Sequence, residues 1–291
     1  MRGVCFSVFA IAMLAAMPAA RAADCPQAEI GSAASAVQDA RYTLMALPPN
    51  AELQTAIPRD TARAVADLKT RLAAFVLAYM RCQPQNADAT GIALDLSRLG
   101  WARAPAPDGG DGASPRPSPA RPGRELTFDV RALPEGLLGI TATFAIPCGS
   151  DTLLMVFEHR DGGWAEIMRL GARPYRDVTH AYNAFDYAVS SSDGGWFLVE
   201  KHAPASCVSF FAGISYSVLQ PGPDAMRART VFAASDTIFA GGTDFGQLSV
   251  GPGYFEIRFH NRNGGEDAAR DYVRRFSVDG QGVRPIPADP P

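Results

Sequence analysis

The sequence predicts a mainly β protein in which a small N-terminal α-helical hairpin precedes an antiparallel β domain. Up to about residue 99, apolar side chains recur every three or four positions, as on one face of a helix. After about residue 125, apolar and polar side chains alternate, as on the two faces of a strand. Turns rich in Gly, Asp and Asn separate the alternating segments, so neighbouring strands are expected to pair as hairpins.

These patterns divide the chain into four segments. We expect a signal peptide over residues 1–22, a helical hairpin region over residues 23–101, a Pro/Gly-rich linker over residues 102–123 and the antiparallel β domain over residues 124–291. The linker contains almost no side chain that could be buried, so it is expected to act as a spacer.

The first segment has the pattern of a cleavable secretory signal peptide. Arg2 precedes an uncharged apolar run over residues 4–17, and Ala20-Arg21-Ala22 places small residues before the expected cut. The run is about 14 residues long, whereas about 20 are needed to span a bilayer. We therefore expect a periplasmic or secreted protein with no membrane span in the mature chain.

Four cysteines remain once the signal peptide, with Cys5, is removed. An even number favours disulfides in an oxidising compartment. In an antiparallel helical hairpin, the start of the first helix and the end of the second lie at the same end, so we predict a bond between Cys25 and Cys82. Cys148 follows one predicted strand and Cys207 precedes another. A second bond between these two is predicted, with free buried thiols as the alternative.

Apolar stripes predict the helices. The first helix is expected to end at Pro48-Pro49, and its stripe is Ile30, Ala33, Val37, Ala40, Leu44 and Leu47. Asp60 or Thr61 is expected to cap the second, whose stripe is Val65, Leu68, Leu72, Phe75 and Tyr79. A third helix after Asp88 would carry Ile92, Leu96 and Leu99. These stripes indicate core packing, with a partner-binding groove or coiled-coil seam as the alternative.

About a dozen short strands are predicted for the β domain. Among them are residues 140–146, 153–159, 185–191, 196–202, 210–219, 229–233, 255–259 and 272–278. The turn Asp161-Gly162-Gly163-Trp164 recurs as Asp193-Gly194-Gly195-Trp196, which suggests a bladed meander as in a β-propeller. About 165 residues would hold three or four blades, and closed propellers typically have about four or more. The predicted fold is therefore an antiparallel, propeller-like meander, with a β-sandwich as the alternative.

Two stretches resemble known proteins. One resemblance is to the Asp-box turn of sialidase-like propellers, and it covers Ser191-Ser192-Asp193 and the residues up to Trp196. The Asp-box pattern, however, has more residues between the aspartate and the tryptophan. The β segment is also similar to uncharacterised exported bacterial proteins. This similarity lies in the Asp-Gly-Gly-Trp turns and in the run Phe144-Ala145-Ile146-Pro147-Cys148-Gly149-Ser150-Asp151. Neither resemblance implies an activity.

Composition and motif spacing exclude several function classes. Without Arg2 and Arg21, the chain has 25 of its 27 basic residues and all 30 acidic residues, so its net charge is −5. This negative charge argues against nucleic acid as a partner. Phosphate loops, dinucleotide fingerprints and zinc-ligand spacings are missing from the sequence. We therefore expect no cofactor and no metal.

Candidate catalytic residues are few. Glu200 and His202 are two residues apart in a predicted strand, so their side chains share a face and could orient a base or bind a metal. Isolated surface or edge histidines are the alternative interpretation. Gly213-Ile214-Ser215-Tyr216-Ser217 lacks the final glycine of a nucleophile elbow.

An aromatic cluster between the two Asp-Gly-Gly-Trp turns suggests a binding surface. Its weak candidates are Tyr175, Tyr182, Asp186 and Tyr187, which could form a shallow ligand or carbohydrate surface, with packing between blades as the alternative. The favoured function is an exported, non-catalytic binding or interaction module for an unknown protein or carbohydrate ligand. The alternative is an exported hydrolase with a propeller-type active-site channel, which would require His202, Glu200, Asp186 and Asp236 to converge.

Overall fold

The computed structural model describes residues 25–47, 56–101, 122–147, 149–160, 162–205, 211–239, 245–261 and 270–287. The predicted signal peptide, most of the predicted linker, Cys148 and Cys207 lie outside the described residues. The side chain of His260 also lies outside them. The predictions made for these parts of the chain stay predictions.

Three helices form the N-terminal part, as the apolar stripes predict. They are α1 (Gln27–Ala46), α2 (Arg59–Met80) and α3 (Ala89–Trp101). The predicted cap of α2 is wrong, because the helix begins directly after Pro58 and has no side-chain cap. The fixed φ of proline suits the entry into a helix, where a missing N–H costs nothing. Within the described ranges, no helix is both long and apolar enough to cross a membrane.

The predicted disulfide between Cys25 and Cys82 is confirmed. Its sulfur atoms are 2.00 Å apart and its Cα atoms 5.2 Å apart. Cys25 precedes α1 and Cys82 follows α2, so the bond joins the two helices at one end of the antiparallel pair.

Strands dominate the rest of the described chain. They are β1 (Thr127–Ala132), β2 (Leu137–Ile146), β3 (Gly149–Arg160), β4 (Gly163–Leu170), β5 (Asn183–Ser192), β6 (Gly195–Ala203), β7 (Phe211–Gln220), β8 (Arg229–Phe239), β9 (Gln247–Gly251), β10 (Tyr254–Asn261), β11 (Arg270–Asp279) and β12 (Gly282–Ile286). The second Asp-Gly-Gly-Trp turn joins β5 to β6, as predicted. β3 and β4 likewise pair on either side of the first such sequence, whose Asp161 lies outside the described residues.

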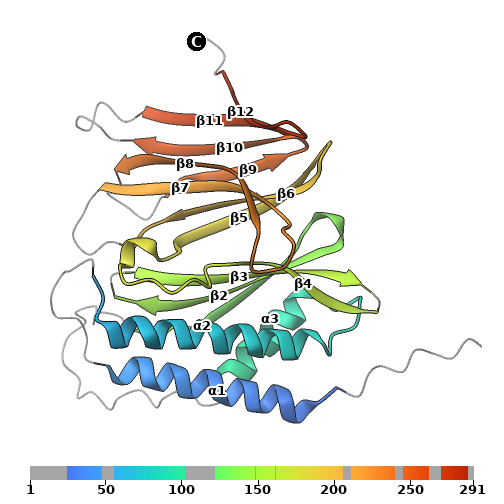
Figure 1. Cartoon of the computed structure of the whole chain (residues 1–291), viewed down its shortest axis with the longest axis vertical. Coiled ribbons are helices and arrows are strands. Elements are labelled where there is room, and N and C mark those ends of the chain that lie inside the picture. The colour runs from blue at the N-terminus through green and yellow to red at the C-terminus, as the bar shows by residue number, and fades with distance from the viewer. Residues whose placement is uncertain are drawn as a thin grey trace, which may run out of the picture.

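The strands form three antiparallel sheets of four strands each. Their orders are β1-β2-β3-β4, β5-β6-β7-β8 and β12-β11-β10-β9, so every sheet is a meander of consecutive strands. This confirms the predicted mainly β, antiparallel fold with a small helical part. A four-stranded meander is also the unit of a propeller blade. Here, however, the three sheets stack in an open series and do not close into a ring (Figure 1).

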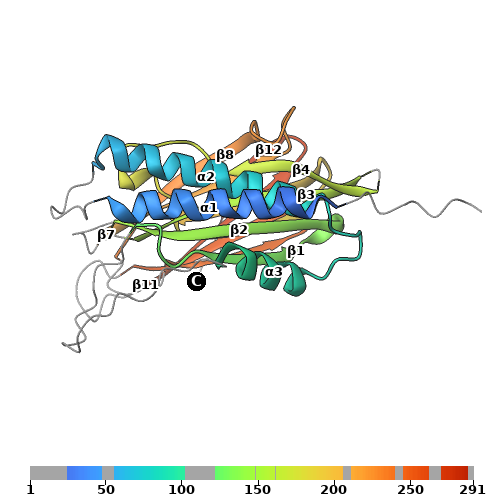
Figure 2. The same ribbon diagram turned by 90° about the horizontal axis from the view of Figure 1, so that it is seen from below.

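The molecule is layered, with the helices on one side followed by the first, second and third sheets (Figure 1). Seen from below, α1 and α2 lie side by side across the first sheet (Figure 2). The helices share one hydrophobic core with one face of the first sheet, and the other face packs on the second sheet. The other face of the second sheet packs on the third. Consequently, β2 and β3 are buried on both faces, whereas β9 and β12 are buried on one at most.

Candidate functional site

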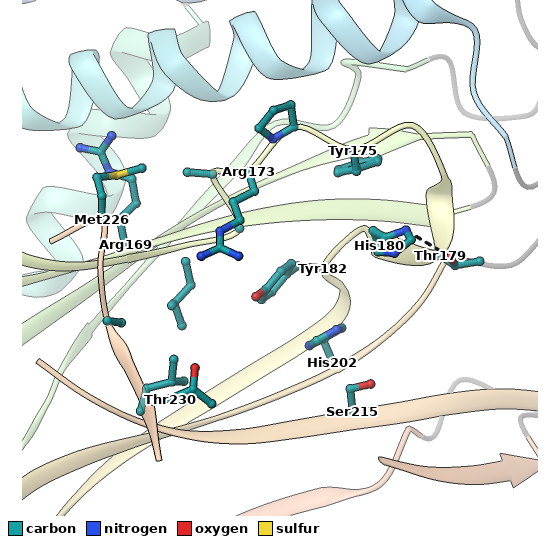
Figure 3. Close-up of a pocket in the computed structure, with 16 residues that line it drawn as sticks. Arg169, Arg173, Tyr175, Thr179, His180, Tyr182, His202, Ser215, Met226 and Thr230 are labelled. Carbon is teal, nitrogen blue, oxygen red and sulfur yellow. Dashed lines mark hydrogen bonds between the residues drawn. The ribbon is translucent and has the colours of Figure 1, made fainter. Parts of the chain in front are cut away.

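A cavity of about 520 Å³ opens between the first and second sheets (Figure 3). One wall is the loop of residues 171–182, which connects β4 to β5. The facing wall comes from β6, β7, β8 and the loop of residues 221–228. The volume of the cavity is in the range of small-molecule binding sites, about 300–1,000 Å³.

A buried ion pair fixes the loop of residues 171–182. Lys69 of α2 places its Nζ 2.5 Å from Asp151 Oδ2 of β3, and neither side chain is more than 2% exposed. The same ammonium donates to the carbonyl oxygen of Gly171 at 2.6 Å and lies 4.6 Å from the centre of the Tyr175 ring. Burial lowers the pKa of Lys69, and the charge of Asp151 opposes that shift.

Asp151 also accepts three bonds from neutral donors. The Tyr175 hydroxyl donates to Oδ2 at 2.8 Å, and the backbone N–H groups of Thr152 and Tyr182 donate to Oδ1 at 3.0 Å each. Burial, reinforced by the charge of Asp151, raises the pKa of Tyr175, so this phenol stays protonated. The carboxylate therefore joins the middle and the end of the loop to β3, while Lys69 bonds to Gly171 at its start.

Gly171 permits the turn that starts this loop. Its φ is +77°, and a Cβ at this position would lie 2.2 Å from the carbonyl oxygen of Thr152. Only glycine adopts this conformation so close to a neighbouring backbone without strain. The wall of the cavity is thus set by backbone geometry as well as by the ion pair.

A histidine and a carboxylate form one polar pair at the facing wall. His202 Nδ1 lies 2.8 Å from Glu200 Oε2, and the side chains are 17% and 5% exposed. Tyr182 stacks on the His202 ring, with ring centres 4.4 Å apart. Burial raises the pKa of Tyr182, with a further contribution from Glu200. As predicted from their spacing, Glu200 and His202 share one face of β6.

Arginine, histidine and hydroxyl side chains complete the lining. Arg173 and His180 are exposed residues of the loop, and Figure 3 shows Arg173 extending toward Tyr182. Ser215 also lines the cavity, and it is the direct register partner of His202 on β7. Arg169 is held in place by Glu166, which accepts hydrogen bonds from its Nε at 2.6 Å and its Nη2 at 2.5 Å.

The structure gathers some of the sequence-based candidates and separates others. Tyr175, Tyr182 and His202 line the cavity, with Glu200 behind His202. Asp186 lies elsewhere, where its Oδ1 accepts a hydrogen bond from Arg131 at 3.0 Å.

Tyr187 and Asp236 also lie away from the cavity. The Tyr187 ring is buried against Gly139, where an added Cβ would lie 2.2 Å from its hydroxyl oxygen. Asp236 accepts hydrogen bonds from Tyr216 and Arg274, toward the third sheet. The convergence that the hydrolase hypothesis requires is therefore limited to Glu200 and His202.

Sequence reasoning missed Lys69, Asp151 and Arg173. One compositional signal could have found the first, because only Lys69 and Lys201 among the 27 basic residues are lysines. Both are buried, and Lys201 likewise donates to backbone carbonyl oxygens, those of Phe245 and Gly246. In this chain both lysines thus place a compact ammonium group, with its three donors, against backbone carbonyl oxygens.

Among the described residues, no group of three or more His, Cys, Asp or Glu side chains could hold a metal ion. Aromatic, hydroxyl and arginine side chains line the cavity. A scan of protein-family models, a search of curated proteins and a search of solved structures each find no match to this chain.

Proposed function

We propose that this chain is an exported, non-catalytic binding protein whose ligand occupies the cavity between the first and second sheets. The observation that carries the proposal is a preformed cavity with one wall held in place by a buried ion pair and its hydrogen bonds. Lys69 and Asp151 form their hydrogen bonds with other groups of the protein, whereas Arg173 and Ser215 face the cavity. A binding site of this kind needs little reordering when its ligand enters.

The chemistry of the lining supports a small polar ligand, and a carbohydrate fits it best. Tyr182 and His202 form a stacked aromatic pair, and Ser215 and Thr230 supply hydroxyl groups. Apolar side chains such as Leu219 lie among them. Mixed aromatic and hydroxyl surfaces can contact the apolar faces of a sugar and bond to its hydroxyl groups. The Cys25–Cys82 disulfide fits an oxidising location outside the cytoplasm.

A blocked cavity tests this proposal. Thr230 is an exposed residue of β8 that lines the cavity, so Thr230→Trp should fill it without removing a core contact. Thr237 is an exposed residue of the same strand that does not line this cavity, and Thr237→Trp is the matched control. We expect at least one member of a panel of neutral and acidic saccharides to raise the melting temperature of the wild type and of the control variant.

The same saccharide should not raise the melting temperature of Thr230→Trp. A panel in which no saccharide stabilises the wild type contradicts the proposal. Equal stabilisation of all three proteins contradicts the location of the site.

One observation favours a hydrolase as the second candidate. His202 is bonded through Nδ1 to Glu200, and Ser215 is its register partner, which places Ser, His and Glu side chains together. A nucleophilic serine must, however, bond to its base, and no hydrogen bond joins Ser215 to His202 among the described residues. Turnover of an ester or glycoside substrate that is lost in both Ser215→Ala and His202→Ala would support the hydrolase against the binding protein.

A further inference from the structure

A second cavity lies next to the first, on the other side of Pro174 and Tyr175. Its volume is about 440 Å³, and it is formed by the first turns of α2 and the loop of residues 171–182. Pro174 and Tyr175 line both cavities, so the two spaces adjoin at this pair of residues. Arg59, Arg63 and Arg176 line the second cavity.

Arginines without partners are concentrated at this place. Among the arginine side chains that the structure describes, three have no hydrogen bond or ion pair, namely Arg59, Arg173 and Arg176. All three line one of the two cavities. Arg63 has only a long contact with Asp60, at 3.9 Å, in which both side chains are about four-fifths exposed.

Few carboxylates balance these charges. Asp60 is the partner of Arg63, and the Asp177 carboxylate accepts a hydrogen bond from the backbone N–H of Thr179 at 2.9 Å. Glu166 is already bonded to Arg169. A chain with a net charge of −3 therefore carries a locally positive surface across the two cavities. Such a surface attracts anions and raises their local concentration.

We infer that the ligand is an acidic oligosaccharide that extends over Pro174 and Tyr175 and places anionic groups in both cavities. This inference rests on the proposed binding function and names its substrate class. Arg173 would bind one anionic group in the first cavity, and Arg59 and Arg176 would bind another in the second. Guanidinium groups bind carboxylates through paired, charge-assisted hydrogen bonds, which makes uronic acids the best match, with sulfate esters as the second source of the same charge.

Calorimetric titration of the mature protein tests the inference with three probes of equal length. The probes are an oligogalacturonate, a sulfated oligosaccharide and a neutral maltooligosaccharide. The variants are Arg173→Gln, the double variant Arg59→Gln/Arg176→Gln, and the control Arg98→Gln, which removes one charge from α3. We expect an anionic probe to bind the wild type and the control equally, and each test variant at least about tenfold more weakly.

The outcomes separate the two proposals. Arginine-dependent binding of oligogalacturonate or of the sulfated probe supports the inference and identifies the source of the charge. Binding of the neutral probe that is insensitive to both arginine variants overturns the inference and leaves the binding function standing. Loss confined to Arg173→Gln overturns the extension into the second cavity. Failure of every probe to bind contradicts both proposals.

Discussion

Replacing Lys69 by methionine removes the ammonium group that joins α2 to the loop of residues 171–182. Methionine keeps the unbranched stem of lysine, so the core contacts of the stem are largely retained. The change leaves the fully buried carboxylate of Asp151 without a counter-ion. Breaking a buried ion pair by removing one partner typically costs about 3–5 kcal/mol. Because the Tyr175 hydroxyl and two backbone N–H groups still donate to Asp151, we expect a loss of about 3 kcal/mol.

Urea unfolding followed by circular dichroism measures this loss. Arg71→Met is the control, because Arg71 also lies on α2 but forms an exposed pair with Asp67, and its loss should cost less than about 0.5 kcal/mol. Adding Asp151→Asn to Lys69→Met removes the unpaired buried charge and should recover about 1–2 kcal/mol. A cost below about 1 kcal/mol for Lys69→Met, or a double variant less stable than Lys69→Met, would refute the reasoning.

Three further predictions concern stability. Removing the disulfide with Cys25→Ser/Cys82→Ser should cost about 4 kcal/mol in urea unfolding, because it opens a 57-residue loop; no change would contradict this role. Tyr187→Phe should be neutral or stabilising by up to about 1 kcal/mol, because the buried hydroxyl has no partner, and a clear loss in thermal unfolding would disprove it. Hydrogen bonds from Arg275 lower the pKa of Glu256, so their stabilisation is present above its ordinary value of 4.5 and disappears in acid. The stability difference between wild type and Glu256→Gln should accordingly shrink as the pH falls, and a constant difference would contradict it.

Local chemistry made much of the fold predictable. The alternation of Phe255, Ile257 and Phe259 with polar residues matches the burial of these aromatic and aliphatic side chains against the second sheet. The position of Cys25 and Cys82 at one end of a hairpin follows from helix geometry alone. Consecutive hairpins likewise determine which strands pair within each sheet.

The stacking of the sheets could not be predicted in the same way. Strand pairing does not determine which face of a meander meets which neighbour, since that choice depends on contacts between side chains distant in sequence. β2 and β3 are buried on both faces because the first sheet lies between the helices and the second sheet. A helical hairpin expected beside the β domain is thus part of its core.

Only some of the residues at the cavity could be predicted from the sequence. The spacing of Glu200 and His202 correctly placed them on one face of a strand. Tyr182 was a candidate because it belongs to the aromatic cluster between the two Asp-Gly-Gly-Trp turns, and it stacks on His202. Lys69 and Asp151 are 82 positions apart and meet only after α2 packs on the first sheet. Tertiary contacts of this kind leave no periodic signal.

Hydrogen exchange of the protein, with and without a saturating oligogalacturonate, tests the location and the class of the ligand together. We predict slower amide exchange in the loop of residues 171–182 and the loop of residues 221–228, which face each other across the cavity. We predict unchanged exchange in β9 and β10, which belong to the third sheet. Slower exchange confined to the third sheet, or none anywhere, would contradict a ligand site between the first and second sheets.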